Sequence, residues 1–440
     1  MDIPELSELQ RAWFTEEKRK LEDSKKRRYL HFDSRIYTLA EKQTAALISP
    51  DHVIRNSFYP FIRDDKIQRR YKWKDGKRII EPKIRPISYA AHADALIYSF
   101  YTTILNRAYE AFVRKQGISD NVLAYRRLGG KSTLDFASEV FELIRKSQNC
   151  IAICFDIKGF FDNLDHNILK TQWQRVLEAE RLPNDHFAIY KSMTTYSYVR
   201  KDDLVKRLNL DKRKLGSMSR YCTVKNFHKK VQGGKLIQVN ADKGIPQGSP
   251  ISAVLSNIYM IDFDLVISKY IANMGGLYRR YCDDIIVVVP TAKKTIAEKF
   301  VIDEIAKLNL DISPEKTDIV EFEKDKLTIE IKDGHGRKRL QYLGLEFDGK
   351  NIYLRHRGLA SFQRRMAKAV HGAIGWAKKE NKNRIPKRRL YEKFSVYGKQ
   401  NYLIYARRAA TKLNSSTVAR QTQPKRMLKL LKKRIKKDAG

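Results

Sequence analysis

YRRYCDDIIVVV, the stretch from Tyr278 to Val289, says more about the fold than any other part of the sequence. Its adjacent carboxylates, Asp283 and Asp284, open a strongly β-forming segment, Ile285–Val289. Two neighbouring ionised aspartates repel each other, and a divalent cation that neutralises them makes the pair tolerable. The alternative is a surface hairpin turn that happens to contain two aspartates, because Asp is a common turn residue.

A third carboxylate lies upstream, in IAICFDIKGFFDNLDH (Ile151–His166). A strand predicted over Ile151–Phe155 ends on Asp156, and two aromatic residues follow at Phe160 and Phe161. A carboxylate at one strand end and a carboxylate pair at another strand's turn can converge on one metal site. Such a site suits two-metal phosphoryl chemistry, in which cations roughly 3.5–4 Å apart hold the attacking and leaving oxygens. Aspartate supplies the oxygen ligands that hard cations such as Mg²⁺ prefer.

Between these two elements, GIPQGSPISAVLSNIYM (Gly244–Met260) combines an irregular loop with a helix. Two glycines and two prolines predict a tight loop, and an apolar, helix-like run begins at Ser252. A glycine-rich turn into a helix lets the backbone come close to a base or a phosphate. An ordinary loop followed by a buried helix is the alternative.

In this order, the three elements resemble the reverse transcriptase family. DIKGFFDNLDH, which begins at Asp156, resembles the family's first catalytic motif, GIPQGSPIS its template and nucleotide motif, and YCDD its Y-x-D-D signature. The resemblance extends from about Tyr71 to Phe347. Further stretches resemble the family's fingers motifs, a later palm motif and the primer-grip hairpin: Arg85–Tyr98, Asn121–Thr133, Ser313–Thr317 and Gln341–Phe347.

The resemblance implies an α+β fold of the right-hand polymerase type, with fingers, a palm built on an antiparallel sheet, and a helical thumb. We expect an N-terminal helical extension over 1–50, fingers over 51–150, a palm over 151–350, and a basic helical thumb and tail over 351–440. A basic insertion at about 200–235 separates the first two palm motifs.

Local patterns predict several elements directly. Asp75-Gly76 is a favoured two-residue turn, so Tyr71–Ile80 should form a hairpin. Helices are predicted from periodicity and breakers over Ala90–Phe112, over Leu134–Lys146, from about Asp165, over Ser361–Lys379 and over Lys387–Ala410.

The resemblance also implies the roles of the carboxylates. Asp156 and Asp283 would be the primary metal ligands, and Asp284 would be a third, less directly coordinating carboxylate. Two Mg²⁺ ions are expected, with Mn²⁺ as a substitute. They would activate the primer's 3′ hydroxyl and hold the triphosphate, while the protein supplies positioning and charge neutralisation.

Nucleotide-binding roles follow in the same way. Phe161 matches the steric gate that excludes a 2′ hydroxyl, although it could instead be a core aromatic. Gln247 and Gly248 would lie beside the incoming nucleotide and template. Arg85 or Arg78 would hold the triphosphate, because guanidinium suits bidentate phosphate contacts.

Two further roles come from the downstream motifs. Tyr342, Leu343 and Gly344 would form the primer grip. Lys316 could protonate the leaving pyrophosphate, although a solvated lysine explains the residue equally well.

The charge is strongly positive: 88 basic and 50 acidic residues give a formal net charge of +38. Arg357–Gly440 contains 25 basic and three acidic residues, and Arg200–Lys235 contains 12 and three. Such blocks attract polyphosphate, although a solvated face or a disordered tail is the ordinary explanation for a charge run. Six aromatics interleave with the C-terminal bases and are expected to be mostly core: Phe362, Trp376, Phe394, Tyr397, Tyr402 and Tyr405.

Composition and targeting signals bound the class of protein. The chain has 42% hydrophobic residues, which is typical of a globular protein, and no apolar run long enough for a membrane span. Its four cysteines have neither zinc spacing nor a disulfide framework, and the acidic start is unlike a signal peptide. We therefore expect a cytoplasmic protein without structural zinc. Its oligomeric state stays open.

Within the family, the motifs look most like the bacterial lineage of group II intron and retron enzymes. Cys282, the N-terminal extension, the basic insertion and the basic C-terminus most resemble the defence-associated reverse transcriptases, of which type 2 fits best. That resemblance implies an antiviral (anti-phage) role, a structured non-coding RNA as template, dNTPs as substrates and a DNA product. The alternatives are a retron or group II intron-type enzyme, an RNA-dependent RNA polymerase, and a non-catalytic RNA-binding module.

Overall fold

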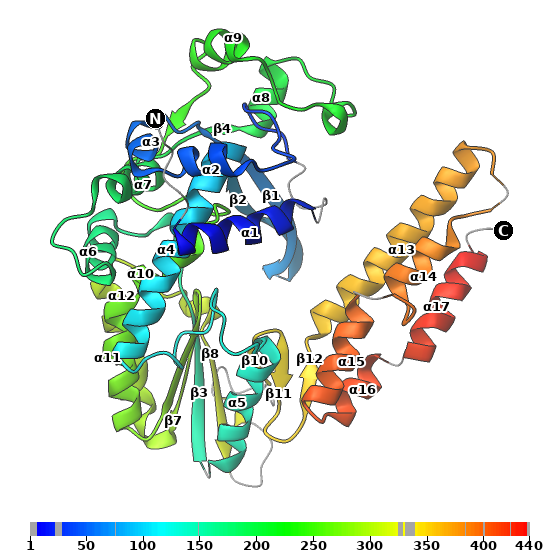
Figure 1. The fold of residues 1–440 in the computed structure, drawn as a ribbon. Helices are drawn as coiled ribbons and strands as arrows, with labels where there is room; N and C mark the ends of the chain where they lie inside the picture. Colours follow the sequence, from blue (N-terminus) through cyan, green and yellow to red (C-terminus); the bar gives the residue numbers. More distant parts are fainter. Residues whose placement is uncertain are drawn as a thin grey trace. The chain divides into compact units, whose positions relative to one another are not determined.

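The computed structural model describes residues 7–22, 29–74, 76–147, 149–323, 329–330, 339–382, 384–398, 401–422 and 424–437 (Figure 1). The chain divides into two compact units, which are described separately. The first comprises Met1–Arg126, Ile157–Ile267 and Ile302–Ile312, and the second comprises Arg127–Asp156, Ser268–Val301 and Ser313–Gly440. No helix in the described ranges is long and apolar enough to cross a membrane.

The second unit contains a five-stranded sheet in the order β6-β7-β3-β8-β9. Every neighbouring pair is antiparallel, which confirms the predicted antiparallel sheet and, with the helices, the α+β class. The two central strands are almost entirely apolar and buried, because the sheet is covered on both faces. The strands are β3 (Asn149–Asp156), β6 (Leu277–Tyr281), β7 (Asp284–Pro290), β8 (Asp318–Glu323) and β9 (Ile329–Glu330).

Helix α5 (Thr133–Lys146) supplies part of the core of this unit. A capping box between Ser132 and Asp135 starts the helix, close to the predicted Leu134. Its apolar face packs with β3, β7 and β8 in one buried cluster, where the ring of Phe141 stacks on Phe347 at 4.6 Å between centroids. A smaller sheet, β10-β11-β12, joins the same cluster: β10 (Leu340–Tyr342), β11 (Leu345–Phe347) and β12 (Ile352–Leu354).

The C-terminal part of the second unit is helical, as predicted, but one predicted helix is divided into two. The single helix predicted over Lys387–Ala410 is two helices, α14 (Lys387–Phe394) and α15 (Tyr402–Lys412). Asn401 caps α15 by accepting hydrogen bonds from two backbone N–H groups. Gly398 lies so close to the Glu392 carbonyl that no side chain fits there, so the chain must turn between the helices. The remaining helices are α13 (His356–Lys379), α16 (Ser416–Thr422) and α17 (Pro424–Lys437).

The aromatics of this basic region are divided between core and surface. Phe362 and Phe394 are buried in a cluster with the apolar face of α17. Trp376, Tyr397 and Tyr405 are 43%, 71% and 36% exposed, so the expectation of a mostly buried set was wrong for these three.

The first unit is built around a long hairpin in a four-stranded sheet, β2-β1-β4-β5. The predicted hairpin is confirmed by the pairing of its arms up to Lys74 and Lys77, and the arms are longer than predicted, whereas Asp75 of the predicted turn lies outside the described residues. The strands are β1 (Phe61–Lys74), β2 (Lys77–Tyr89), β4 (Ser197–Arg200) and β5 (Gln238–Val239).

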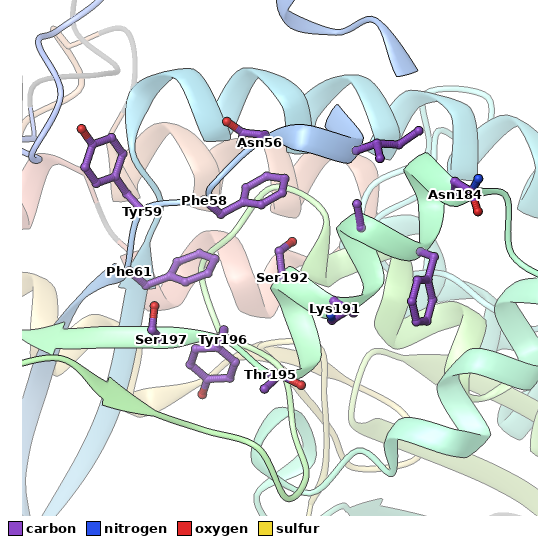
Figure 2. A pocket seen from close by; sticks show the side chains of 13 residues that line it. Asn56, Phe58, Tyr59, Phe61, Asn184, Lys191, Ser192, Thr195, Tyr196 and Ser197 are labelled. Atoms are coloured by element: carbon purple, nitrogen blue, oxygen red, sulfur yellow. The ribbon is translucent and has the colours of Figure 1, made fainter. Parts of the chain in front are cut away.

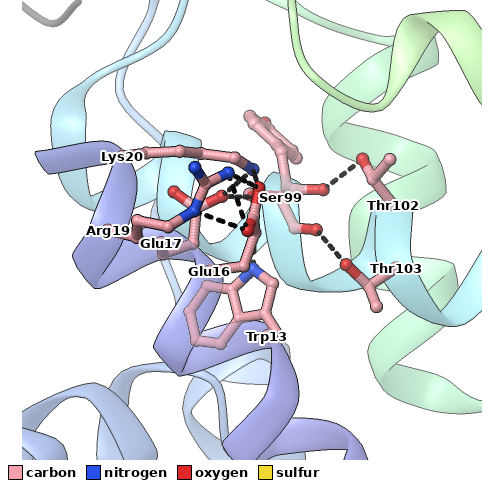
Figure 3. Close-up of polar contacts among 9 residues, drawn as sticks. Trp13, Glu16, Glu17, Arg19, Lys20, Ser99, Thr102 and Thr103 are labelled. Carbon is pink, nitrogen blue, oxygen red and sulfur yellow. Dashed lines mark hydrogen bonds and ion pairs between the residues drawn. The ribbon is translucent and has the colours of Figure 1, made fainter. Parts of the chain in front are cut away.

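Helix α4 (His92–Lys115), predicted over Ala90–Phe112, runs through the first unit, and α1 (Glu8–Glu22) docks on it (Figure 3). The indole of Trp13 donates to the Ser99 hydroxyl at 3.2 Å, and that hydroxyl donates to the buried Glu17 carboxylate at 2.7 Å. Lys20 pairs with the same carboxylate, so the buried charge is compensated. The unit also contains α2 (Glu41–Leu47), α3 (Pro50–Arg55), α6 (His166–Val176), α7 (Asn184–Thr194) and α10 (Ser252–Tyr259), while α11 (Ile261–Asn273) and α12 (Lys294–Lys307) cross the unit boundary.

The basic insertion at about 200–235 is folded, with α8 (Lys201–Arg207), α9 (Val224–Asn226) and a π-helical segment η3 (Phe227–Gln232). Its apolar side chains are buried with Phe32 and Ile62 in one cluster. This packing leaves most of its lysines and arginines on the surface.

Candidate active site

The aspartate pair lies at the tight turn between β6 and β7. Tyr281 pairs with Asp284, so Cys282 and Asp283 form a two-residue hairpin loop. Cys282 has a φ of 61°, and a positive φ only at the first loop residue is the sign of a type II′ turn. A non-glycine residue in this region stores about 1–3 kcal/mol of strain.

A buried arginine, Arg280, stabilises that turn. Arg280 is fully buried, and its guanidinium donates to the Cys282 carbonyl at 3.1 Å. The burial of a charged side chain is costly unless it is paired and hydrogen-bonded, so this contact fixes the turn more firmly than a solvated side chain could.

The register of β3 and β7 brings two carboxylates together. Asp156 is directly opposite Asp284, and directly opposed side chains on neighbouring strands have Cβ atoms about 4.5–5.5 Å apart. The pKa of Asp284 is raised to about 6, first because burial removes water from around the carboxyl group and then because Asp283 and Asp156 are negatively charged, while Arg355 and Lys316 lower it. Three carboxylates therefore share one electrostatic environment.

Lys316 lies beside this group. Its ammonium forms an ion pair with the Asp156 carboxylate and also donates to the Ser313 hydroxyl at 3.4 Å. The backbone N–H of Ser313 donates to the Asp156 carbonyl at 2.9 Å, so the loop that carries Lys316 is attached to the end of β3. Lys316 therefore lies beside the three carboxylates, and its positive charge neutralises the carboxylate of Asp156.

Arg355, which the sequence analysis did not single out, is the second cation at this site. Two of its N–H groups donate to the Gln341 side-chain oxygen, at 3.0 and 2.5 Å, and its backbone N–H donates to the Gly344 carbonyl at 3.3 Å. Its positive charge lowers the pKa of Asp284. The sequence offered no signal for it beyond its place downstream of the predicted primer-grip hairpin, from which β12 separates it.

The carboxylate oxygens of Asp156, Asp283 and Asp284 suit a hard divalent cation that also binds substrate. Within the described ranges, no group of three or more His, Cys, Asp or Glu side chains is arranged to hold a metal ion by itself. Mg²⁺ in polymerase-type sites is bound through one or two carboxylates, with substrate phosphates and water completing the octahedron. The opposed pair Asp156 and Asp284, with Asp283 at the adjacent turn, gives three carboxylates from which such ligands can be drawn.

The hairpin predicted over Gln341–Phe347 is present as β10 and β11. Leu343 and Gly344 form its two-residue loop with φ values of 44° and 85°, which is the sign pattern of a type I′ turn. Tyr342 is buried beneath the hairpin, and burial raises the pKa of its phenol. The loop itself is accessible to a bound strand because Gly344 is exposed.

The aromatic pair in the first unit is divided as expected. Phe160 is 3% exposed and belongs to the core, whereas Phe161 keeps part of its ring accessible. The Phe161 carbonyl accepts a hydrogen bond from the Ile245 N–H at 2.8 Å. Gly244 packs against the backbone of Asp162, where an added Cβ would lie 2.6 Å from the carbonyl oxygen. These two contacts hold the segment at Phe161–Asp162, in the first palm motif, against the segment at Gly244–Ile245, in the second.

Gln247 and Gly248 lie on the same loop, against the end of β2. The Gln247 carbonyl accepts from the Ser88 N–H at 2.8 Å. A Cβ on Gly248, whose φ is 117°, would lie 2.8 Å from the Ser88 carbonyl, so only glycine allows this approach. The Ser252 hydroxyl, at the start of α10, donates to the Pro246 carbonyl at 2.6 Å and closes the loop.

The structure does not decide between Arg85 and Arg78, the two candidates for holding the triphosphate. Arg85 is exposed on β2, opposite Lys66. The side chain of Arg78 lies outside the described part of the chain. The structure therefore groups Asp156, Asp283, Asp284 and Lys316 in the second unit, and Phe161, Gln247 and Gly248 in the first.

Comparison with known proteins gives one family match. The model of the family described as reverse transcriptase (RNA-dependent DNA polymerase) matches residues 72–347. Among solved structures, apo telomerase from Candida tropicalis truncated from its C-terminal domain is 11% identical, with a TM-score of 0.42 over 66% of this chain and 55% of that one. Telomerase from Candida albicans in complex with a fragment of telomeric RNA is 12% identical, with a TM-score of 0.37 over 70% and 47%. The chain thus spans about half the length of these structures.

Proposed function

Because the chain belongs to the reverse transcriptase (RNA-dependent DNA polymerase) family, whose model matches residues 72–347, we propose that it copies an RNA template into DNA by two-metal nucleotidyl transfer. The observation that carries this proposal is the pairing of β3 with β7, which sets Asp156 opposite Asp284 next to the turn at Asp283. An inert hairpin turn would not need a third carboxylate opposite it.

Divalent metal ions are general in this family, and Mg²⁺ is the ion we propose here, with Mn²⁺ as a substitute. Such ions would activate the primer hydroxyl and neutralise the triphosphate. Asp156 and Asp283 would be the primary ligands and Asp284 the third carboxylate. Lys316, already paired with Asp156, would stand close enough to the reacting phosphates to act as the general acid.

The nucleotide would be held by residues of the first unit. Phe161 would pack under the sugar and exclude a 2′ hydroxyl, because its backbone is fixed by Ile245 while its ring stays accessible. Gln247 and Gly248 would lie beside the incoming nucleotide and template, and Arg85 or Arg78 would hold the triphosphate. The β10–β11 hairpin, with Tyr342, Leu343 and Gly344, would hold the primer end.

We propose the domain organisation of the sequence analysis: a helical extension over 1–50, fingers over 51–150, a palm over 151–350 and a basic thumb with tail over 351–440. The template would be a structured non-coding RNA, the substrates dNTPs and the product DNA, in a bacterial antiviral role in the cytoplasm. The resemblance to defence-associated enzymes supports that role. The 25 basic residues of Arg357–Gly440 support an extended RNA contact.

The decisive experiment compares the wild-type chain with Asp283→Ala/Asp284→Ala on a primed RNA. The double variant should lose primer extension with dNTPs and Mg²⁺, because the opposed carboxylates are gone, and it should keep its affinity for RNA. Equal extension by the two proteins would refute the assignment. Extension with ribonucleotides instead of deoxynucleotides would favour an RNA-dependent RNA polymerase. Sequencing of copurified RNA and DNA separates a dedicated non-coding template from a retron or intron RNA.

A further inference from the structure

A cavity of about 490 Å³ in the first unit has no part in the roles described above (Figure 2). It lies between the segment that leads from α3 into β1 and the segment from α7 to β4. Five of its thirteen lining residues are aromatic, and none is acidic. Pockets of about 300–1,000 Å³ are the size that takes small organic groups.

The aromatic wall of this cavity is held in place from behind. Tyr98 is almost fully buried, and the rings of Phe58 and Phe61 stack on it at 5.3 and 6.0 Å between centroids. Tyr196 meets Phe61 edge to face at 5.8 Å. Figure 2 shows Phe58 and Phe61 on one chain segment and Tyr196 on another. The wall is thus formed before any ligand binds.

The loop that carries this wall is fixed by a buried carboxylate. Asp94 accepts hydrogen bonds from the Asn56 amide at 3.1 Å and from the Tyr59 N–H at 2.9 Å. The Tyr98 hydroxyl donates to Ser192 at 3.0 Å, which joins α4 to α7. Three elements therefore set the shape of the cavity, and a ligand would cost little ordering of the protein.

The mouth of the cavity is cationic and aromatic. Phe187 is 40% exposed, and the Lys170 ammonium lies 5.5 Å from its ring centroid. Lys191, also exposed, lines the cavity together with the hydroxyls of Ser192 and Thr195. The flat apolar wall suits a nucleobase, and the Lys191 ammonium and the Thr195 hydroxyl suit its phosphate, whereas the Ser192 hydroxyl already donates to the Ile189 carbonyl at 2.8 Å.

We infer that this cavity binds a nucleobase of single-stranded RNA, stacked against its aromatic wall, with the adjoining phosphate at Lys191. Charge complementarity decides the occupant, because an acid-free aromatic cavity with lysines at its mouth favours a polyanion that carries flat bases. The inference rests on the proposed function only in taking RNA as the polymer, and it adds a contact outside the catalytic and nucleotide-binding residues.

The test uses the full chain and a short oligouridylate that carries 5-iodouridine, without dNTPs. Irradiation should cross-link the RNA to the peptides that contain Phe58, Phe187 or Tyr196. Phe187→Ala should weaken RNA binding by about 5- to 150-fold, since stacking on an aromatic side chain contributes that factor per base. Phe187→Trp should restore it. Lys191→Gln should lower the slope of log affinity against log salt by about 0.7.

Matched controls remove the same groups elsewhere in the first unit. Tyr37→Ala deletes an aromatic that is 72% exposed and does not line the cavity, and Lys42→Gln deletes an exposed charge on α2. Both should bind RNA as the wild type does. Unchanged RNA affinity in Phe187→Ala and Lys191→Gln would overturn the inference, as would cross-links that form only outside the cavity.

The two proposals fail separately. If the wild-type chain extends a primer while the cavity variants bind RNA normally, the cavity proposal is wrong and the polymerase stands. If the wild-type chain extends no primer but the cavity variants lose RNA affinity, the cavity proposal stands alone.

Discussion

At the scale of single residues, Phe161 is the side chain whose role is easiest to isolate. Phe161→Ala would open the space under the sugar without emptying the core, because Phe160 holds the buried position. Loss of one such packing contact changes discrimination by roughly 1–3 kcal/mol, or about 10–200-fold. The measurement is the ratio of kcat/KM for deoxy- and ribonucleotides, with Phe161→Tyr as the control that keeps the ring. A ratio unchanged in the alanine variant would place the gate at another residue.

A second prediction at this scale concerns the protonation of Asp284. Its pKa, raised to about 6, means that the folded chain holds a proton there between about pH 4 and 6 that the unfolded chain has lost. Stability from this group therefore falls as the pH rises through that window. Cation binding needs the ionised form, so extension at low Mg²⁺ should fall as the pH drops below about 6.

Higher Mg²⁺ should shift this acid limb to lower pH, because the cation competes with the proton. Profiles of kcat/KM against pH at two Mg²⁺ concentrations measure the shift. A limb that does not move with Mg²⁺ would mean that another group titrates.

At the scale of elements, the side chain of Arg355, at the start of helix α13, connects that helix to the β10–β11 hairpin by a hydrogen bond to Gln341. Arg355→Gln would remove the contact with Gln341 and the positive charge beside Asp284. Because Arg355 is exposed, we expect a loss of only about 1 kcal/mol, or roughly fivefold in primer extension. The effect should appear mainly in KM for the primed template, since the hairpin would hold the primer.

Two comparisons make this prediction specific. Arg11→Gln removes an exposed arginine charge from α1, which has no proposed contact with RNA or primer, and should extend primers normally. Gln341→Ala should reproduce the part of the defect that comes from their contact, and the double variant should be no worse than Arg355→Gln alone, because that contact is already lost there. Additive losses would show that the two residues act independently.

At the scale of the whole molecule, the basic C-terminal region should govern affinity for any RNA. On α17 the apolar residues Met427, Leu431 and Ile435 are buried, whereas Lys429, Lys432 and Lys433 are exposed. Replacement of Lys429, Lys432 and Lys433 by Gln should flatten the slope of log affinity against log salt by about 0.7 for each lost phosphate contact. The preference for a cognate over a random RNA should change less, because charge reads no sequence.

Titrations at several salt concentrations with both RNAs measure this effect. The matched control replaces three exposed lysines elsewhere, Lys18, Lys42 and Lys299, and should leave the slope intact. An unchanged slope in the α17 variant would assign the RNA contact to the fingers and the insertion at 200–235.

The local patterns determined which segments would become strands, helices and turns. The residues of β3, the hairpin formed by β1 and β2, and α5 were predictable in this way, because each depends on near neighbours in the chain, whereas the hairpin at Leu343-Gly344 was expected from the family resemblance. The motif order was also enough to predict the α+β right-hand polymerase fold and the reverse transcriptase family, and both are confirmed. The defence lineage, the template and the residue roles stay predictions.

Only the tertiary structure decided which side chains share an environment. The register that opposes Asp156 to Asp284, the ion pair of Lys316 and the bridge from Arg355 to Gln341 all join residues far apart in the chain. The break between α14 and α15 and the exposure of Trp376, Tyr397 and Tyr405 depend on what packs against them. The aromatic cavity between α3 and α7 is of the same kind. Sequence patterns report local propensity and burial, whereas register and packing arise from long-range contacts that no local window contains.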